Sequence, residues 1–215
     1  MTDAAREPAR IGRADWPIGA VVLAAGRSTR MGPENKLLRA VRGVPMICRA
    51  VDAFLEARVD PVVVVTGHEE DLVRAALGGR RIYVVHNSEH ELGMSTSLRV
   101  GLQALPDDLD GVVVGLGDMP WVLPEHIDAL VEAFDPDGPA SICVPVHDGE
   151  RGNPVLWAGR YLAELKRLTG DAGAKSLLAR YADSVHRVEL DDPGVLRDVD
   201  TPDALVPSGD LATGP

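Results

Sequence analysis

The feature that most constrains this chain is an apolar run that stops abruptly in small residues. Residues 18–23 are Ile, Gly, Ala, Val, Val and Leu23, a pattern typical of a strand buried on both faces. The small side chains of Ala24, Ala25 and Gly26 follow, and they let a ligand approach main-chain N–H groups. Cations come directly behind them, at Arg27, Arg30 and Lys36. A strand that runs into a bare turn with cations behind it is what a phosphate-binding site requires.

The charge of the chain favours a small anionic ligand over a polymer. The 215 residues carry a formal net charge of -11 at pH 7, which argues against a general surface for nucleic acid or anionic membranes. The window 27–42 reverses that sign, since Glu34 is its one acid. Such a local cationic pocket suits a small phosphorylated ligand. The alternatives are a basic surface loop for the whole window and a solvated basic helix face for Arg39 and Arg42.

Length and composition predict one sizeable globular domain, because 45% of the residues are hydrophobic. Both cysteines, Cys48 and Cys143, lie in apolar settings, so we expect buried free thiols in a reducing compartment. No apolar run is long enough to span a membrane, and residues 1–17 lack the apolar core of a signal peptide. We therefore expect a soluble, cytoplasmic protein, with a domain over 18–206 between disordered tails at 1–17 and 207–215.

Strands and helices alternate along the predicted domain. Strands are expected at 18–25, 62–66, 81–85, 111–116, 141–145, 154–157 and 185–190. Helices are expected at 45–58, 68–77, 94–105, 124–134, 161–168, 174–181 and 201–205. Repeated βα units predict a single-domain, three-layer α/β/α fold of the Rossmann-like kind, with a mostly parallel sheet. Ligands of such folds bind beyond the carboxyl ends of the strands, so each loop that follows a strand is a candidate site.

Two acidic segments are candidates for a metal site. Asp118 follows the apolar strand 111–116 within Gly-Asp-Met-Pro, where a carboxylate can hold Mg²⁺ against the phosphates of a nucleotide. The alternative is an aspartate that stabilises a turn. Asp200, within the acidic segment 198–203, is by itself best explained as a helix cap. Beside Asp118 it would supply a second carboxylate to the metal.

A third candidate is the segment 93–99, which places three hydroxyls and main-chain N–H groups at the start of a helix. This arrangement can bind a ribose, a base or a phosphate. Ser95 can also serve as the helix cap.

Several familiar sites are excluded. The stretch 26–36 has neither Walker A spacing nor a dinucleotide fingerprint. His86 and His90 are four residues apart, but they fall at a strand end and in a loop rather than on a helix, so we expect a solvated loop instead of a zinc pair. No Ser-His-Asp order or Cys-His pair supports a covalent nucleophile.

At these motifs the chain resembles the MobA-like nucleotidyltransferase family, and within it the branch of MocA-type molybdenum cofactor cytidylyltransferases. The resemblance covers residues 18–205 and rests on six segments in order: 23–36, 93–98, 117–120, 152–154, 170–175 and 198–202. These segments are specific for the superfamily and less specific for the substrate.

The resemblance implies attack by a phosphate oxygen of molybdopterin on the α-phosphate of CTP, or of another NTP, with pyrophosphate leaving. Main-chain groups of residues 23–26 would hold base and ribose, and Arg27 and Lys36 would neutralise the triphosphate. Asp118, with Asp200, would hold the cofactor Mg²⁺ at the α-phosphate.

The resemblance also implies flanking contacts to both substrates. Ser95 and Ser97 would complete the nucleotide pocket, with Gly67 and Asn87 as weaker candidates after their strands. The acceptor would meet Asn153 and Lys175. A molybdenum hydroxylase or its chaperone is the implied protein partner of a monomer or weak dimer.

Ala25 bears on the choice of base. The guanylyl branch resembles Leu-Ala-Gly-Gly at this turn, whereas the cytidylyl branch resembles the Leu-Ala-Ala-Gly found here. A methyl group in place of hydrogen would crowd a purine more than a pyrimidine, so the sequence favours CTP.

Three other functions stay open. One is a transferase of the same fold that acts on a sugar phosphate or another phosphorylated alcohol. Another is a MobA-like oxidoreductase, although no nicotinamide fingerprint is present. The third is a non-catalytic protein that binds nucleotide or pterin and delivers cofactor to a molybdenum enzyme.

Overall fold

A computed structural model of the chain describes residues 16–26, 35–170 and 174–199. Its strands are β1 (Ile18–Ala24), β2 (Ala40–Val41), β3 (Val44–Pro45), β4 (Val62–Thr66), β5 (Tyr83–His86), β6 (Gly111–Leu116), β7 (Ile142–His147), β8 (Glu150–Arg151), β9 (Val155–Ala158) and β10 (Val185–Glu189). The central sheet has the order β10-β7-β9-β6-β1-β4-β5, with β8 paired to β7, and β2 with β3 forms a separate hairpin.

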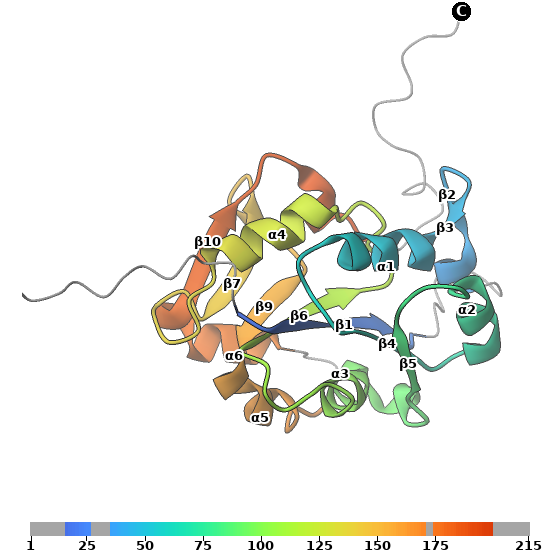
Figure 1. Cartoon of the computed structure of the whole chain (residues 1–215), viewed down its shortest axis with the longest axis horizontal. Helices are drawn as coiled ribbons and strands as arrows, with labels where there is room; N and C mark the ends of the chain where they lie inside the picture. The colour runs from blue at the N-terminus through green and yellow to red at the C-terminus, as the bar shows by residue number, and fades with distance from the viewer. Residues whose placement is uncertain (1–15, 27–34, 171–173, 200–215) are drawn as a thin grey trace, which may run out of the picture.

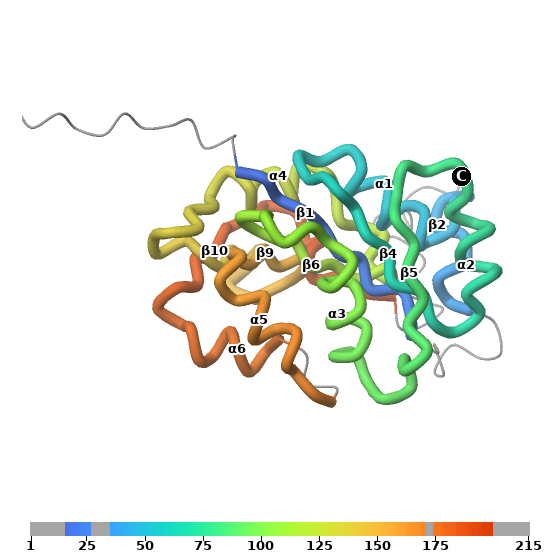
Figure 2. Tube along the Cα trace, turned by 60° about the horizontal axis from the view of Figure 1, so that its bottom comes forward, coloured from blue at the N-terminus to red at the C-terminus, as the bar shows by residue number. Residues whose placement is uncertain are grey.

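Helices cover both faces of this sheet. The α-helices are α1 (Met46–Glu56), α2 (Glu70–Ala76), α3 (Met94–Gln103), α4 (Pro124–Ala133), α5 (Leu162–Leu165) and α6 (Lys175–Arg180). The short 3-10 helices are η2 (Lys36–Leu38), η3 (His90–Leu92), η4 (Gly159–Tyr161), η5 (Ala182–Ser184) and η6 (Pro193–Leu196). Figure 1 shows α1 and α4 on one face and α3, α5 and α6 on the other, and the turned view in Figure 2 agrees. The predicted three-layer α/β/α fold with a mostly parallel sheet is confirmed.

Most of the sheet is parallel. Strand β1 pairs in parallel with β4 and with β6, and β5 pairs in parallel with β4. Strand β9 is the exception, because it runs antiparallel to both of its neighbours, β6 and β7. The carboxyl ends of β1, β4, β5 and β6 therefore meet at one edge, where the site lies.

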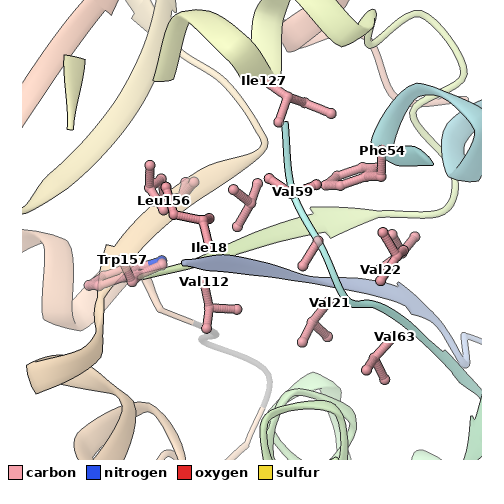
Figure 3. Close-up of a cluster of buried hydrophobic side chains, with 14 of the residues drawn as sticks. Ile18, Val21, Val22, Phe54, Val59, Val63, Val112, Ile127, Leu156 and Trp157 are labelled. Carbon is pink, nitrogen blue, oxygen red and sulfur yellow. The ribbon is translucent and has the colours of Figure 1, made fainter. Parts of the chain in front are cut away.

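The apolar run that opens the domain is buried on both faces, as its composition predicts. Val21 and Val22 are both fully buried. Figure 3 shows Val22 on the side of Phe54, and Val21 on the side of Val63. Two glycines bring the helices close. A side chain on Gly101 of α3 would lie 2.5 Å from Val21, and one on Gly115 of β6 would lie 2.3 Å from Phe54.

Some local predictions are corrected. Arg39 and Arg42 are not on a helix: Arg39 ends η2, and Arg42 occupies the β2–β3 turn with φ 52. The helix expected over 161–168 is shorter, since it consists of η4 and the single turn of α5. Trp16, two residues before the predicted start of the domain, packs against the core, and the predicted domain bounds stay a prediction. The expected helix 201–205 lies outside the described residues.

Two remaining predictions concern cysteines and membranes. Cys48 and Cys143 are buried and free, as expected. Among the described residues, no helix has the length and apolar character needed to cross a bilayer.

Candidate active site

A cavity of about 470 Å³ lies at the carboxyl ends of β1 and β6. Its wall comes from four segments: the end of β1 with the turn that follows, η2, the η3–α3 junction, and the turn after β6. Its lining includes the predicted nucleotide-binding residues Leu23, Ala24, Ala25, Gly26, Lys36 and Ser97, and the predicted catalytic and metal-binding residue Asp118. The structure thus brings together residues up to 95 positions apart in the sequence, as the strand-end argument predicts.

Neighbouring segments fix the turn that ends β1. The carbonyl oxygen of Leu23 accepts a hydrogen bond from the main-chain N–H of Gly117 (2.9 Å), and that of Ala25 accepts one from His68 (3.4 Å). Gly26, in contrast, has open space around it, because a side chain built there meets no atom of the described residues within 4 Å, its chain neighbours aside. The protein's own packing does not require a glycine at this point, which is what we expect where a ligand approaches the main chain.

Lys36 and Asp118 form an ion pair in the cavity wall. The Lys36 Nζ atom donates to Oδ2 of Asp118 at 2.7 Å, and the two side chains are 13% and 22% exposed. The helix η2 places the lysine, and the side chain of Asn35 caps that helix by accepting from the N–H of Leu37 at 3.1 Å. A cation and an anion therefore stand together at the carboxyl end of β6.

The turn that carries Asp118 also contacts Val199. The main-chain N–H of Val199 donates to the carbonyl oxygen of Asp118 at 3.1 Å. Val199 is fully buried in a small apolar cluster with Val41 and Met46. The next residue, Asp200, lies outside the described residues, as does Arg27. Their predicted roles stay predictions.

Trp121, three residues after Asp118, is surrounded by arginines. The guanidinium carbons of Arg42, Arg49 and Arg197 lie 5.4, 5.8 and 5.1 Å from the centroid of its ring. Arg49 also donates from Nε to the carbonyl oxygen of Pro120 at 3.3 Å. Cation–π contacts and this hydrogen bond hold the back of the Asp118 turn.

The start of α3 reaches the cavity through Ser97. Its Oγ accepts from Nδ2 of Asn87 at 2.9 Å, and the same amide donates to Oγ1 of Thr96 at 2.8 Å. Asn87 is almost fully buried and braces the helix start rather than lining the cavity. Ser95 does not line the cavity either, and the helix cap is Gly93 instead of the expected serine.

Gly67 lies behind the cavity wall. A side chain there would come within 2.8 Å of Ala25 and of His90. Gly67, Asn87 and Ser95 thus have packing roles, and their predicted contact with a nucleotide stays a prediction.

The two predicted acceptor residues lie away from this cavity. The main-chain N–H of Asn153 donates to the carbonyl oxygen of Val195 at 2.9 Å, and its side chain is half-buried. Lys175 is exposed at the first position of α6. Neither lines the cavity, so an acceptor that meets them must extend across the sheet edge.

The prediction of a solvated loop is right for His86 and wrong for His90. His86 is exposed, with Nδ1 2.8 Å from Oε2 of Glu70. His90 is half-buried in η3 and lines the cavity, and its enclosed Nδ1 has no hydrogen-bond partner among the described residues. The sequence offers only an indirect signal for this, because His90 lies between a strand end and the candidate segment 93–99.

The Asp118 carboxylate suits a magnesium ion that takes some of its ligands from the protein and the others from substrate phosphates. No group of three or more His, Cys, Asp or Glu side chains that could hold a metal occurs within residues 16–26, 35–170 and 174–199. The Asp118 carboxylate, already paired with a cation, is the type of ligand that Mg²⁺ takes together with substrate phosphates.

The profile of the family described as the MobA-like NTP transferase domain matches residues 20–185. This chain belongs to that family. The match contains the β1 turn, η2, the start of α3 and Asp118, which together build the cavity. The matched family is one of NTP transferase domains, and its profile covers nearly all of the central sheet.

Solved members of this fold extend over almost the whole chain. Rv0371c from Mycobacterium tuberculosis H37Rv is 32% identical, with a TM-score of 0.75, over 88% of this chain and 95% of that chain. A complex of Rv0371C with manganese aligns with a TM-score of 0.71, at 31% identity, over 87% and 95%. A nucleotidyl transferase from Methanothermobacter thermautotroptrophicus is 30% identical, with a TM-score of 0.75, over 86% and 92%.

A curated relative matches a shorter part. The bifunctional protein GlmU of Heliobacterium modesticaldum is 34% identical over 135 residues, which is 62% of this chain and 29% of that protein. The chain spans less than a third of the length of this and the other GlmU proteins that it matches.

Proposed function

We propose that this MobA-like protein transfers CMP from CTP to the phosphate of a molybdopterin-type acceptor and releases pyrophosphate. The observation that carries the proposal is the Lys36–Asp118 pair, 2.7 Å apart, in a cavity whose wall includes the small-residue end of β1. The main chain of that turn accommodates the base and ribose, and the ion pair marks the phosphate end.

The nucleotide contacts follow from the wall of the cavity. The open space at Gly26 lets the sugar or a phosphate approach the backbone. The ammonium of Lys36, together with Arg27, neutralises the triphosphate. Ser97 adds a hydroxyl from the start of α3, which Asn87 holds in place.

The reaction needs no protein nucleophile. A phosphate oxygen of the acceptor forms a bond to the α-phosphorus of CTP. The bond from that phosphorus to the oxygen bridging to the β-phosphate breaks, and pyrophosphate leaves with this oxygen and its electron pair. The residues of the cavity position the two phosphates and neutralise charge. Asp118, with Asp200, would hold Mg²⁺, which when bound offsets the negative charge of the phosphates.

Ala25 supports CTP over GTP, since its methyl group reduces the space that the cavity leaves for the base. Asn153 and Lys175 would contact the acceptor. The product would pass, in the cytoplasm, to a molybdenum hydroxylase or its chaperone. The protein would work as a monomer or weak dimer.

A second candidate is transfer of a nucleotide to a different phosphorylated acceptor. The 34% identity over 135 residues to the bifunctional protein GlmU favours it, because a protein that is not named for the molybdenum cofactor shares this part of the chain. The oxidoreductase and delivery-protein alternatives both predict no pyrophosphate.

The test is pyrophosphate release from CTP and Mg²⁺, measured with molybdopterin, with a sugar phosphate and without acceptor. We expect pyrophosphate release when molybdopterin is the acceptor, and none with the sugar phosphate or without an acceptor. Release with the sugar phosphate would favour the second candidate. No release with either acceptor, while the pterin still binds, would favour a delivery protein.

A further inference from the structure

The titratable groups of the described cavity wall fall into two sets. Lys36 and Asp118 form the ion pair at the proposed phosphate end. The others are His90 and Glu91, which η3 contributes. Lys36 is the one lysine or arginine among the described residues of the wall, and it attracts the triphosphate to its own end, so the uncharged part of a nucleotide belongs at the η3 end.

Packing holds His90 at this end. Its Cβ lies 2.8 Å from the point that a side chain on Gly67 would occupy, and the Cβ of Ala25 lies 2.8 Å from the same point. The imidazole also neighbours that of His68, with 6.5 Å between ring centroids. Ala25 and His90 therefore flank the bare α-carbon of Gly67 and form one wall.

The imidazole of His90 carries a nitrogen that the described residues leave without a partner. Nδ1 is enclosed and makes no hydrogen bond to any of them. Buried polar atoms are nearly always paired in folded proteins, so an unpaired one needs an explanation. His90 also lines the cavity, so a turn of its ring toward a bound base would give this nitrogen a partner and supply that explanation.

We propose that His90 is a base-selecting residue: its imidazole hydrogen-bonds to the base of a pyrimidine nucleotide, while Ala25 limits the size of that base. The role rests on the proposed function, because it requires a nucleoside triphosphate in this cavity. Met94, whose side chain is 45% exposed, borders the same end and offers an apolar surface to the base.

The experiment is calorimetric titration of CTP, UTP and GTP, with Mg²⁺, into the full chain and its His90→Phe variant. Phenylalanine keeps the ring but removes both nitrogens. CTP and UTP share sugar and triphosphate, so the ratio of their affinities isolates the base. We expect His90→Phe to weaken CTP binding by roughly three- to tenfold, the effect of one hydrogen bond, and to change the CTP:UTP ratio.

The matched control is His86→Phe, which alters an exposed histidine outside the cavity and should leave all three affinities unchanged. His90→Gln replaces His90→Phe if circular dichroism shows that the phenylalanine variant is unfolded. Equal weakening of all three nucleotides, or no weakening, overturns the role of His90. Failure of the wild-type chain to bind any of them overturns the proposed function as well, so the two failures are distinguishable.

Discussion

Lys36 and Asp118 are 82 residues apart in the sequence, and their charged groups meet at 2.7 Å in the cavity wall. The pair places one cation and one anion where the proposed reaction needs both. Replacing Asp118 with Asn keeps the shape of the side chain and removes its charge. We expect Asp118→Asn to lower the rate of pyrophosphate release about a hundredfold or more, the scale at which one preorganised electrostatic group acts.

A second ion pair provides the control for this variant. Arg80 donates to Asp52 at 2.6 Å, and Asp52 does not line the active-site cavity. Asp52→Asn should reduce thermal stability slightly and leave turnover unchanged. Equal losses of turnover in the two variants would show that Asp118 acts only through stability.

Gly26 and Gly67 should respond to substitution in opposite ways. A side chain on Gly26 meets nothing, so Gly26→Ala should keep the melting temperature but weaken CTP binding about tenfold or more, because the methyl group occupies the path of the ligand. A side chain on Gly67 would lie 2.8 Å from the carbonyl oxygen of Ala25, so Gly67→Ala should cost about 1–3 kcal/mol of stability. Thermal melts and CTP titrations distinguish the two, and unchanged CTP affinity in Gly26→Ala would place the ligand elsewhere.

Ala25→Gly should relax the selection against purines. Removal of the methyl group enlarges the space for the base beside the wall that Ala25 forms with His90. We expect the ratio of kcat/KM for CTP over GTP to fall, by a lower rate with CTP, a higher rate with GTP, or both. Ala20→Gly is the control, since Ala20 is fully buried in β1, the strand that precedes Ala25, and lies outside the cavity. An unchanged ratio in Ala25→Gly would mean that the base does not lie against Ala25.

His126 should make the protein less stable in mild acid. Burial lowers the pKa of its imidazole, and Nδ1 accepts a hydrogen bond from the N–H of Leu123 at 3.2 Å. The unfolded chain then binds the proton more readily than the folded one, so stability rises with pH here. The contribution of His126 to stability is fully present above about pH 6.5, the pKa of histidine in the unfolded chain. It is lost as the pH falls through the lower pKa of His126 in the folded protein.

Melting temperatures at about pH 5.5 and pH 7.5 check this expectation. His126→Gln, which keeps an acceptor, should flatten the difference between them. His186→Gln, at an exposed position of β10, should leave it as in the wild type. If His126→Gln shows the same difference in melting temperature between the two pH values as the wild type, other groups cause the acid sensitivity.

Much of this architecture follows from local sequence patterns. The valine-rich runs at β1, β4 and β6 need burial on both faces, so they predict central parallel strands, and Asp118 falls at a strand end by the same logic. The antiparallel course of β9 was not predictable, because direction depends on which neighbour a strand pairs with and not on its composition.

The parts of the site that depend on local sequence could be predicted, whereas those that depend on packing between distant segments could not. The turn at 23–26 and Lys36 were identified from strand, small residues and charge. His90 was missed because its role depends on packing against Gly67, a contact between segments that no local pattern contains. The arginines around Trp121 were missed for the same reason, since they come from three separate parts of the chain.

The most direct test of the central claim uses CTP labelled at its α-phosphate, with molybdopterin, Mg²⁺ and the full chain. The proposed reaction predicts that the label appears on the acceptor as CMP, that an equal amount of pyrophosphate is released, and that Asp118→Asn slows both about a hundredfold or more. Label recovered only as free CMP or unreacted CTP, with no labelled acceptor, would contradict the assignment of this cavity to cytidylyl transfer onto molybdopterin.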